Sequence, residues 1–167
     1  MNNRIYLNNN WQFTRSYSEK LHDLHPHAAD LETVRLPHTT AETPFHYFDE
    51  SIYQYNSAYR RLLRPDRTWK GQHIFLTVEA AAHESEVFLN GKSLLLHHCG
   101  YSAYTVDLAP HLRWEEDNVL VIRVDSRETL NQPPFGKVID YMTYGGLYRE
   151  VYLGFAAHPT LPMCSPV

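Results

Sequence analysis

The stretch ESEVFLNGKSLLLHH, residues 84–98, holds the strongest local structural signal in this chain. Two strand-like runs flank the dipeptide Asn90-Gly91. Asn and Gly both tolerate positive φ angles, so this dipeptide favours a two-residue turn between antiparallel strands. We therefore expect a β-hairpin here, and the question is whether the rest of the chain supplies strands to join it.

Several other runs alternate with the period of two that is typical of strands. They are HIFLTVEA (73–80), NVLVIRVD (118–125), LYREVYLGF (147–155), SAYRRLLRP (57–65) and, more weakly, WQFTR (11–15). Helical periodicity is nearly absent, apart from one expected helical turn at Pro110. Many short alternating strands predict an all-β fold, an antiparallel sandwich. We interpret the polar region 22–50 as loops that wrap it.

Length and composition limit the function classes. The 167 residues suit one domain, and the net charge of -4 argues against a nucleic-acid surface, which needs a basic stripe. No apolar run approaches the roughly 20 residues of a membrane span. The opening MNNRIYLNNN has no apolar core of a signal peptide, so we expect a soluble domain. A chain from which a signal peptide had been cleaved would look the same, so the cellular compartment stays open.

The cysteines and histidines predict neither a metal site nor a cofactor. Cys99 and Cys164 belong to no CxxC pair, and we expect two free thiols. None of the 11 histidines falls in an HExxH motif, so we interpret them as surface and loop residues.

No complete active site is visible either. Paired-carboxylate catalysis needs two acids held roughly 5 to 10 Å apart. The consecutive Glu115, Glu116 and Asp117 project in different directions and are typical of a solvated turn. There is no GxSxG elbow, and Gly145-Gly146 leads into a strand rather than the helix of a phosphate loop.

One polar-aromatic cluster, VIDYMTYGG (138–146), places Asp140, Tyr141 and Tyr144 before the last strand. Carboxylates accept hydrogen bonds from sugar hydroxyls, and aromatic faces pack on sugar C–H groups. The residues alone leave two interpretations open: a sugar contact, or a structural loop whose aspartate caps backbone N–H groups. For the similar segment HHCGYSAY (97–104) we favour packing.

Seven motifs in order give the chain a family resemblance. They are LNNNWQF (7–13), VRLPHT (34–39), SAYRR (57–61), EVFLNGKSL (86–94), HHCGYSAYTVDL (97–108), NVLVIRVD (118–125) and YGGLYREVYL (144–153). From about Tyr6 to Phe155 the chain resembles the N-terminal sugar-binding domain of glycoside hydrolase family 2, which includes β-galactosidases, β-glucuronidases and β-mannosidases. It is most similar to the β-galactosidases. Asn9, Cys99 and Tyr104 depart locally from the family pattern.

The resemblance implies a jelly-roll sandwich like that of galactose-binding domains over residues 1–155. Residues 156–167 would then link it to an immunoglobulin-like domain and a (β/α)₈ barrel. The family's two catalytic glutamates lie on that barrel, so this chain should carry no catalytic residue and be inactive alone.

By the same resemblance, Asp140 matches a family aspartate that reaches into the active site and contacts the bound sugar. Tyr141 and Tyr144 would flank it. The implied partners are a β-linked glycoside and the further domains of the same enzyme, with no nucleic acid and no membrane. Two alternatives stay open: a free-standing carbohydrate-binding module and a ligand-free structural sandwich. The identity of the glycoside stays open too.

Arg149 is the anomaly of the last strand, because it alternates in phase with the apolar Leu147 and Val151. One interpretation is an inward charge paired with an acid such as Glu79 or Asp125, since an unpaired buried charge is costly. The other is a bulge after the glycines that turns Arg149 toward the missing barrel. We favour the structural pairing.

Overall fold

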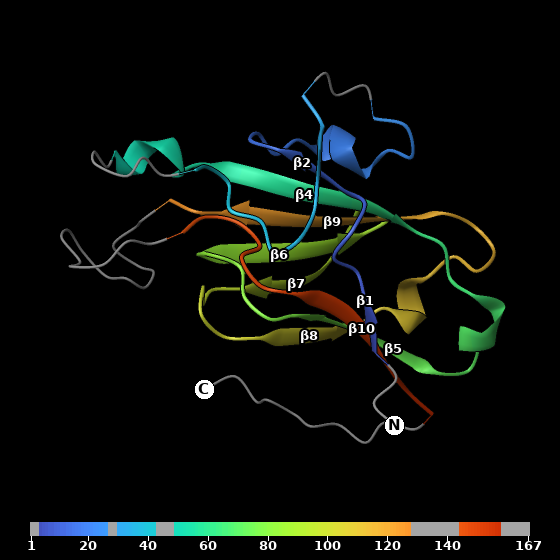
Figure 1. Ribbon diagram of the computed structural model, residues 1–167. Helices are drawn as coiled ribbons and strands as arrows, with labels where there is room; N and C mark the ends of the chain where they lie inside the picture. The colour runs from blue at the N-terminus through green and yellow to red at the C-terminus, as the bar shows by residue number, and fades with distance from the viewer. Residues whose placement is uncertain (1–3, 27–29, 43–48, 128–143, 158–167) are drawn as a thin grey trace.

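Two antiparallel β-sheets face each other in the computed structural model, which describes residues 4–26, 30–42, 49–127 and 144–157 (Figure 1). The four-stranded sheet has the order β1 (Arg4–Tyr6), β10 (Val151–Ala156), β5 (His73–Val78) and β8 (Tyr104–Asp107). The six-stranded sheet has the order β3 (Glu32–Val34), β2 (Trp11–Thr14), β4 (Asn56–Leu63), β9 (Asn118–Asp125), β6 (Glu84–Leu89) and β7 (Lys92–His97). All these strand pairs are antiparallel, which confirms the predicted sandwich.

The helical content of the described residues is limited to short 3₁₀ turns. They are η1 (Glu19–His22), η2 (Glu50–Ile52), η3 (Arg67–Trp69) and η4 (Ala109–His111). The last of these is the turn predicted at Pro110, which is its second residue. Within the described ranges, no helix has the length and apolar character that crossing a membrane requires.

The core lies between the sheets and follows the alternation seen in the sequence. Ile74, Leu76 and Val78 of β5 are fully buried, while the residues between them are half-exposed. Leu76 is paired with Leu153 of the neighbouring β10. The six-stranded sheet contributes large buried side chains such as Tyr59 on β4. The period of two therefore predicted which side chains enter the core.

The hairpin of β6 and β7 forms as predicted. Asn90 has a φ of 52° and Gly91 a φ of 81°, so both adopt the left-handed conformation that this turn requires. Asn90 also holds the next strand, because its side-chain oxygen accepts a hydrogen bond from the Val119 amide at 3.0 Å. The pairing shifts register between Val87 and Phe88, as in a β-bulge.

A loop covers the outer face of the six-stranded sheet and builds a second, smaller core there. Leu21 of η1 packs with Phe88 and Val121, which point away from the main core. This agrees with the expectation that the polar region after residue 21 wraps the sandwich, although β3 within that region was not predicted.

The last strand corrects the sequence interpretation of Arg149. β10 begins at Val151, and Arg149 lies in a bend before it, where its side chain is exposed. Its guanidinium carbon lies 5.8 Å from the centre of the Tyr148 ring. The inward pairing with Glu79 or Asp125 is therefore wrong: Asp125 binds Arg127, and no ion pair of Arg149 with either acid is formed. Alternation failed here because the segment is not yet a strand.

The expected free thiol is present at Cys99, which is half-buried in the loop after β7. Cys164 lies outside the described residues. In the same loop region, the favoured packing role holds for Tyr104, whose buried hydroxyl accepts a hydrogen bond from Ser85 at 2.7 Å.

Candidate functional site

Of the three predicted sugar-contacting residues, the structure describes only Tyr144. Asp140 and Tyr141 fall outside the described residues. Tyr144 is described and has 48% of its surface exposed. The structure therefore shows the two ends from which the segment 128–143 departs, at Arg127 and Tyr144. The candidate site consists of the residues around these two ends.

The two ends touch at Gly145. A Cβ atom added to Gly145 would lie 2.6 Å from the Thr40 hydroxyl and 2.9 Å from the Ser126 Cβ, closer than side chains approach. Only glycine allows this contact. Its neighbour Gly146 has a φ of 101°, and a Cβ there would collide with the Tyr59 hydroxyl. Both positions therefore require glycine, because neighbouring atoms lie where a Cβ would be.

Four residues form what we call the loop base: Thr40, Tyr55, Ser126 and Gly145. The fully buried Ser126 hydroxyl donates to the carbonyl oxygen of Tyr53 at 2.5 Å and also lies 3.0 Å from that of Tyr55. The Ser126 amide donates to the Tyr55 carbonyl at 3.1 Å. The Tyr55 hydroxyl donates to the Thr40 carbonyl at 2.6 Å. The Thr40 amide in turn donates to the Gly145 carbonyl at 3.0 Å. The loop base, together with Tyr53, therefore connects both ends of the segment.

A pair of the half-buried His38 and the fully buried Tyr59 supports the glycines from the core side. His38 Nδ1 lies 2.9 Å from the Tyr59 hydroxyl, and the His38 amide donates to the Leu147 carbonyl at 2.8 Å. Burial lowers the pKa of His38 and raises the pKa of Tyr59, so both side chains stay neutral near pH 7. They act as hydrogen-bonding supports rather than charges.

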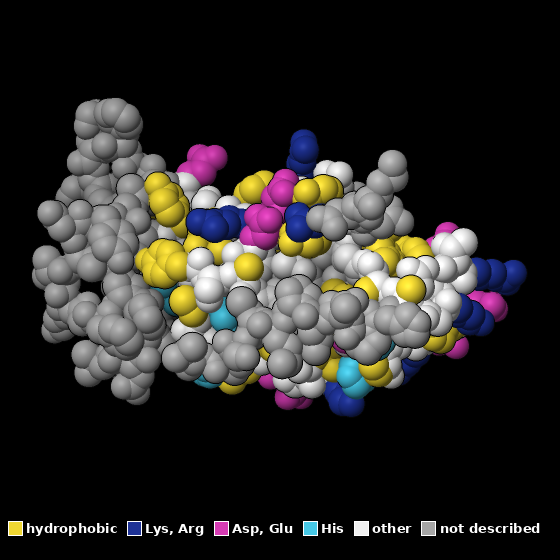
Figure 2. Space-filling model, turned by 90° about the horizontal axis from the view of Figure 1, so that it is seen from below, with side chains coloured by type: hydrophobic (Ala, Val, Ile, Leu, Met, Phe, Trp, Pro, Cys, Tyr) yellow, Lys and Arg dark blue, Asp and Glu magenta, His cyan; other side chains and the backbone are white. Residues whose placement is uncertain are grey.

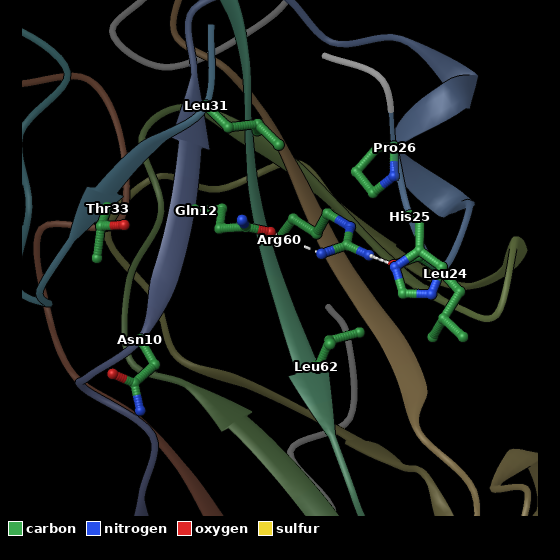
Figure 3. A pocket seen from close by; sticks show the side chains of 9 residues that line it. All are labelled: Asn10, Gln12, Leu24, His25, Pro26, Leu31, Thr33, Arg60 and Leu62. Carbon is green, nitrogen blue, oxygen red and sulfur yellow. Dashed lines mark hydrogen bonds between the residues drawn. The ribbon is translucent and has the colours of Figure 1, made fainter. Parts of the chain in front are cut away.

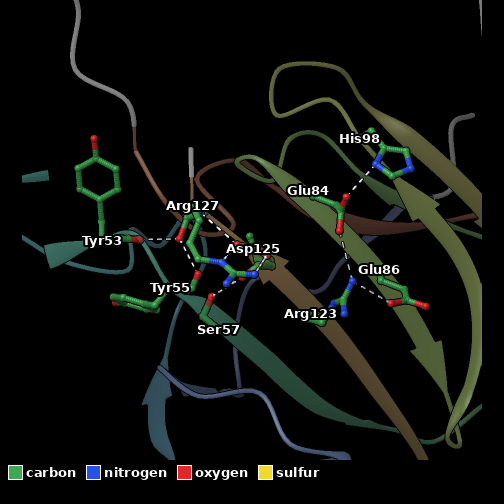
Figure 4. A network of polar contacts seen from close by, with 11 residues as sticks. Tyr53, Tyr55, Ser57, Glu84, Glu86, His98, Arg123, Asp125 and Arg127 are labelled. Atoms are coloured by element: carbon green, nitrogen blue, oxygen red, sulfur yellow. Dashed lines mark hydrogen bonds and ion pairs between the residues drawn. The ribbon is translucent and has the colours of Figure 1, made fainter. Parts of the chain in front are cut away.

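At the exit of β9, Arg127 binds Asp125 through two guanidinium nitrogens, at 2.9 Å from Nε and 2.5 Å from Nη2 (Figure 4). Burial works to raise the pKa of Asp125, but the hydrogen bonds and charge of Arg127 outweigh it, and the pKa is lowered. Next to this pair, Arg123 bridges Glu84 and Glu86 at 3.3 and 3.2 Å. The face beside the loop base thus consists of mutually paired charges.

A separate groove of about 690 Å³ crosses the outer face of β3, β2 and β4 (Figure 3). It is lined by Asn10, Gln12, Leu24, His25, Pro26, Leu31, Thr33, Arg60 and Leu62. Arg60 is 3% exposed and donates to the carbonyls of Leu21, Asp23 and Leu24, so it anchors the covering loop. Among the described residues of this lining there is no carboxylate, so they do not supply the acid pair of a glycosidase.

The remaining candidate residues have structural roles. Glu115 forms exposed ion pairs with Arg67 and Lys70, and Asp117 pairs with Arg64, as the solvated-turn interpretation predicted. Over the residues that the structure describes, no three His, Cys, Asp or Glu side chains gather as a metal site would require.

Sequence reasoning singled out the glycines and Tyr144 but missed Thr40, Tyr55 and Ser126. A signal for Thr40 was present, since it directly follows the motif VRLPHT (34–39). Nothing in the sequence pairs Tyr55 with Ser126, because their contact joins residues 71 positions apart.

Comparison with known proteins decides the family. Over 154 residues, 90% of this chain, it is 39% identical to the β-galactosidase of Thermoanaerobacterium thermosulfurigenes. It is also 32% identical over 153 residues to a β-glucuronidase of Bacteroides fragilis. The chain is an N-terminal β-sandwich domain of glycoside hydrolase family 2. No family model matches the chain.

Solved structures agree with this assignment of the family 2 domain. A calcium-binding mutant of Bacteroides uniformis β-glucuronidase 2 superimposes with a TM-score of 0.80 at 27% identity, over 93% of this chain. The match covers 18% of that enzyme, and the two curated relatives are covered to 21% and 20% of their length. The chain therefore spans about a fifth of the relatives it matches.

Proposed function

We propose that this family 2 domain is a non-catalytic part of a retaining, β-galactosidase-like glycoside hydrolase. It packs on a catalytic barrel, to which residues 156–167 lead, and the segment 128–143 completes the sugar pocket with Asp140. The loop base carries this proposal, because it brings both ends of that segment to one point of the sandwich. The exposed Tyr144 beside it offers an aromatic face.

The chemistry of these residues suits a sugar. A carboxylate at Asp140 would accept hydrogen bonds from hydroxyl groups, and Tyr141 and Tyr144 would pack on C–H faces. The proposal assigns no catalytic residue to this chain, since the two glutamates of a retaining mechanism would come from the barrel. The pure chain should therefore leave a nitrophenyl β-galactoside unhydrolysed, and measured turnover by the fragment alone would overturn this proposal.

A chimeric enzyme tests the proposed role of this domain and of Asp140 in hydrolysis. This chain would replace the matching domain of the T. thermosulfurigenes β-galactosidase, to which it is 39% identical. We expect the chimera to hydrolyse nitrophenyl β-galactoside, and Asp140→Ala to lower its kcat/KM by about a hundredfold. A chimera that folds but is inactive, or an Asp140→Ala variant with full activity, would contradict the proposal.

A second candidate function is a free-standing carbohydrate-binding module. One observation favours it: the outer face of the four-stranded sheet carries Tyr6 and Tyr152, whose ring centres lie 5.7 Å apart. Figure 2 views the molecule from that side, where hydrophobic side chains occur in small groups among charged ones. Calorimetric titration with galactose, lactose and glucuronate separates the functions. Saturable millimolar binding by the chain alone supports the module, and no binding supports the enzyme domain.

A structural sandwich without any ligand is the third interpretation. The Asp140→Ala chimera also addresses it, because a purely structural domain would keep the activity of the enzyme as long as it stayed folded. We therefore pair each activity measurement with a thermal melt.

A further inference from the structure

The covering loop leaves part of the six-stranded sheet open. Its residue Leu21 packs on Phe88 and Val121, over β6 and β9. The groove of about 690 Å³ lies beside it, over β3, β2 and β4 (Figure 3). Its volume falls within the range of roughly 300 to 1,000 Å³ that is typical of ligand sites. Two leucines of its lining, Leu24 and Leu62, are each 43% exposed. The groove therefore offers apolar surface to a ligand.

Arg60 brings a buried positive charge to this groove. Its hydrogen bonds go to neutral oxygen atoms, which are the carbonyls of Leu21, Asp23 and Leu24 and the side-chain oxygen of Gln12 at 2.6 Å. Among the residues that the structure describes, Arg60 forms no ion pair, and the side chain of Asp23 is exposed. Buried charges in proteins are normally paired with an opposite charge. The partner that Arg60 lacks is therefore an anion.

The groove also has hydrogen-bond donors to spare. A guanidinium carries five N–H groups. The bonds of Arg60 use the N–H of Nε, both of Nη2 and one of Nη1, so the second N–H of Nη1 has no acceptor within the described ranges. Gln12 uses only its oxygen on Arg60, which leaves its NH₂ group available. The exposed Asn10 adds a second side-chain amide.

This chemistry fits an acidic peptide better than a sugar. The described lining contains no Phe, Tyr or Trp on which the C–H face of a sugar would pack. Leu24 and Leu62 suit an aliphatic side chain instead. The amides of Asn10 and Gln12 donate and accept hydrogen bonds, as the peptide group does. A carboxylate is the strongest partner for the N–H groups of Arg60.

The topology favours a segment from another polypeptide chain. The chain continues after β10, which belongs to the four-stranded sheet, whereas the groove lies on the outer face of the other sheet. We propose that the groove binds an acidic segment of another polypeptide, with its carboxylate on Arg60 and an aliphatic side chain against Leu24 and Leu62. This inference goes beyond the proposed function and does not depend on Asp140.

Peptide titration of the pure chain tests the inference. The probe is acetyl-Leu-Glu-Leu-amide, and its neutral counterpart is acetyl-Leu-Gln-Leu-amide. We expect the first to shift the nuclear magnetic resonance signals of the Asn10 and Gln12 side-chain amides saturably at millimolar concentration. The second should bind about tenfold more weakly, because it lacks the charge that Arg60 would pair with.

Gln12→Glu provides a carboxylate from within the chain. Its oxygen would take the place of the Gln12 oxygen that already accepts from Arg60, so the fold should stay intact and the acidic peptide should bind about tenfold more weakly. Gln72→Glu is the matched control. It makes the same change of charge outside the groove, where the Gln72 side chain donates to the Thr68 carbonyl. We expect it to leave the affinity unchanged.

Leu62→Ser tests the apolar wall and keeps the inference testable if Gln12→Glu does not fold. We expect it to weaken the binding of the acidic peptide about fivefold. Leu96→Ser is its control, because Leu96 is a strand leucine of similar exposure, 46%, on the distant edge strand β7.

Four results would overturn the inference. The first is equal affinity for the two peptides, and the second is equal affinity of the Gln12→Glu and Gln72→Glu variants for the acidic one. The third is glucuronate shifting the same signals at lower concentration than the peptide, which would make the groove a sugar site. The fourth is a peptide that binds the pure chain but not the chimera, because the further domains of the enzyme would then cover the groove.

Discussion

At the scale of single residues, Gly146 shows how one position can fix the path of a backbone. Its φ of 101° is strained for any residue with a side chain, and the Tyr59 hydroxyl occupies the space that a Cβ would need. The neighbouring isolated bridge pairs Gly146 with Ala82, so the backbone is held from both sides. The Tyr59 hydroxyl is therefore the group that requires glycine at this position.

Substitution of Gly146 by Ala should destabilise the chain by about 3 kcal/mol or more, because it adds both a strained φ and a steric clash. Gly154→Ala is the matched control, since a Cβ at Gly154 meets no atom within 4 Å. Urea unfolding followed by circular dichroism gives both values. Similar unfolding midpoints for the two variants would contradict this account.

At the scale of elements, Arg60 joins the covering loop to the sheet. Its guanidinium reaches from β4 to the covering loop and donates to three of its carbonyls, those of Leu21, Asp23 and Leu24. Burial lowers the pKa of Arg60, yet an arginine stays charged near neutral pH, so these carbonyls solvate a buried cation. Arg60 therefore satisfies three carbonyl groups of this loop with one side chain.

We expect Arg60→Met to lower the free energy of unfolding by about 3 kcal/mol, since it leaves buried carbonyls unpaired. Cleavage by trypsin or chymotrypsin should then begin within residues 15–26. Arg64→Met serves as the control, because the Arg64 side chain is 69% exposed and its ion pair adds little. Unchanged protease resistance of Arg60→Met would exclude the anchoring role.

The sequence predicted those elements whose burial follows the period of two. β5 and the hairpin of β6 and β7 were expected from alternation and from Asn90-Gly91. The three-residue strands β1 and β3 were not, because three residues are too few to show a period. Alternation also failed at Arg149, where backbone contacts of the preceding glycines replace strand pairing.

For the candidate site, local sequence could indicate residue types but not their contacts. Asp140 and Tyr144 were singled out by chemistry and by family resemblance, and the contact of Asp140 with sugar stays a prediction. Tyr55 and Ser126 carry no distinctive motif. They become neighbours only when β4 and β9 pair, so their role follows from the sheet register rather than from the local sequence.

At the scale of the whole molecule, three histidines link stability to pH. Burial lowers the pKa of His22, His38 and His97 below that of a free histidine, which is about 6.5. The unfolded chain therefore takes up protons first as the pH falls. Their contribution to stability is complete above about pH 6.5 and is lost as the pH falls through the lower folded values.

We accordingly expect the midpoint of urea unfolding to be lower at pH 5.5 than at pH 7.5. Replacing all three histidines by glutamine should reduce this difference. A midpoint that rises on acidification, or a triple variant with the same pH dependence as the original chain, would contradict this prediction.

The edges of the two sheets have a practical consequence for handling the protein. β1 and β3 offer only three residues each for pairing with another molecule. β7 is a six-residue edge with Leu94, Leu95 and Leu96 in a row, and its start is guarded by the exposed Lys92. Unpaired apolar edges recruit strands from other chains, and charges on them oppose this. Intermolecular aggregation of the partly unfolded chain should therefore begin at β7. The substitution Leu96→Lys is the first to choose for higher solubility.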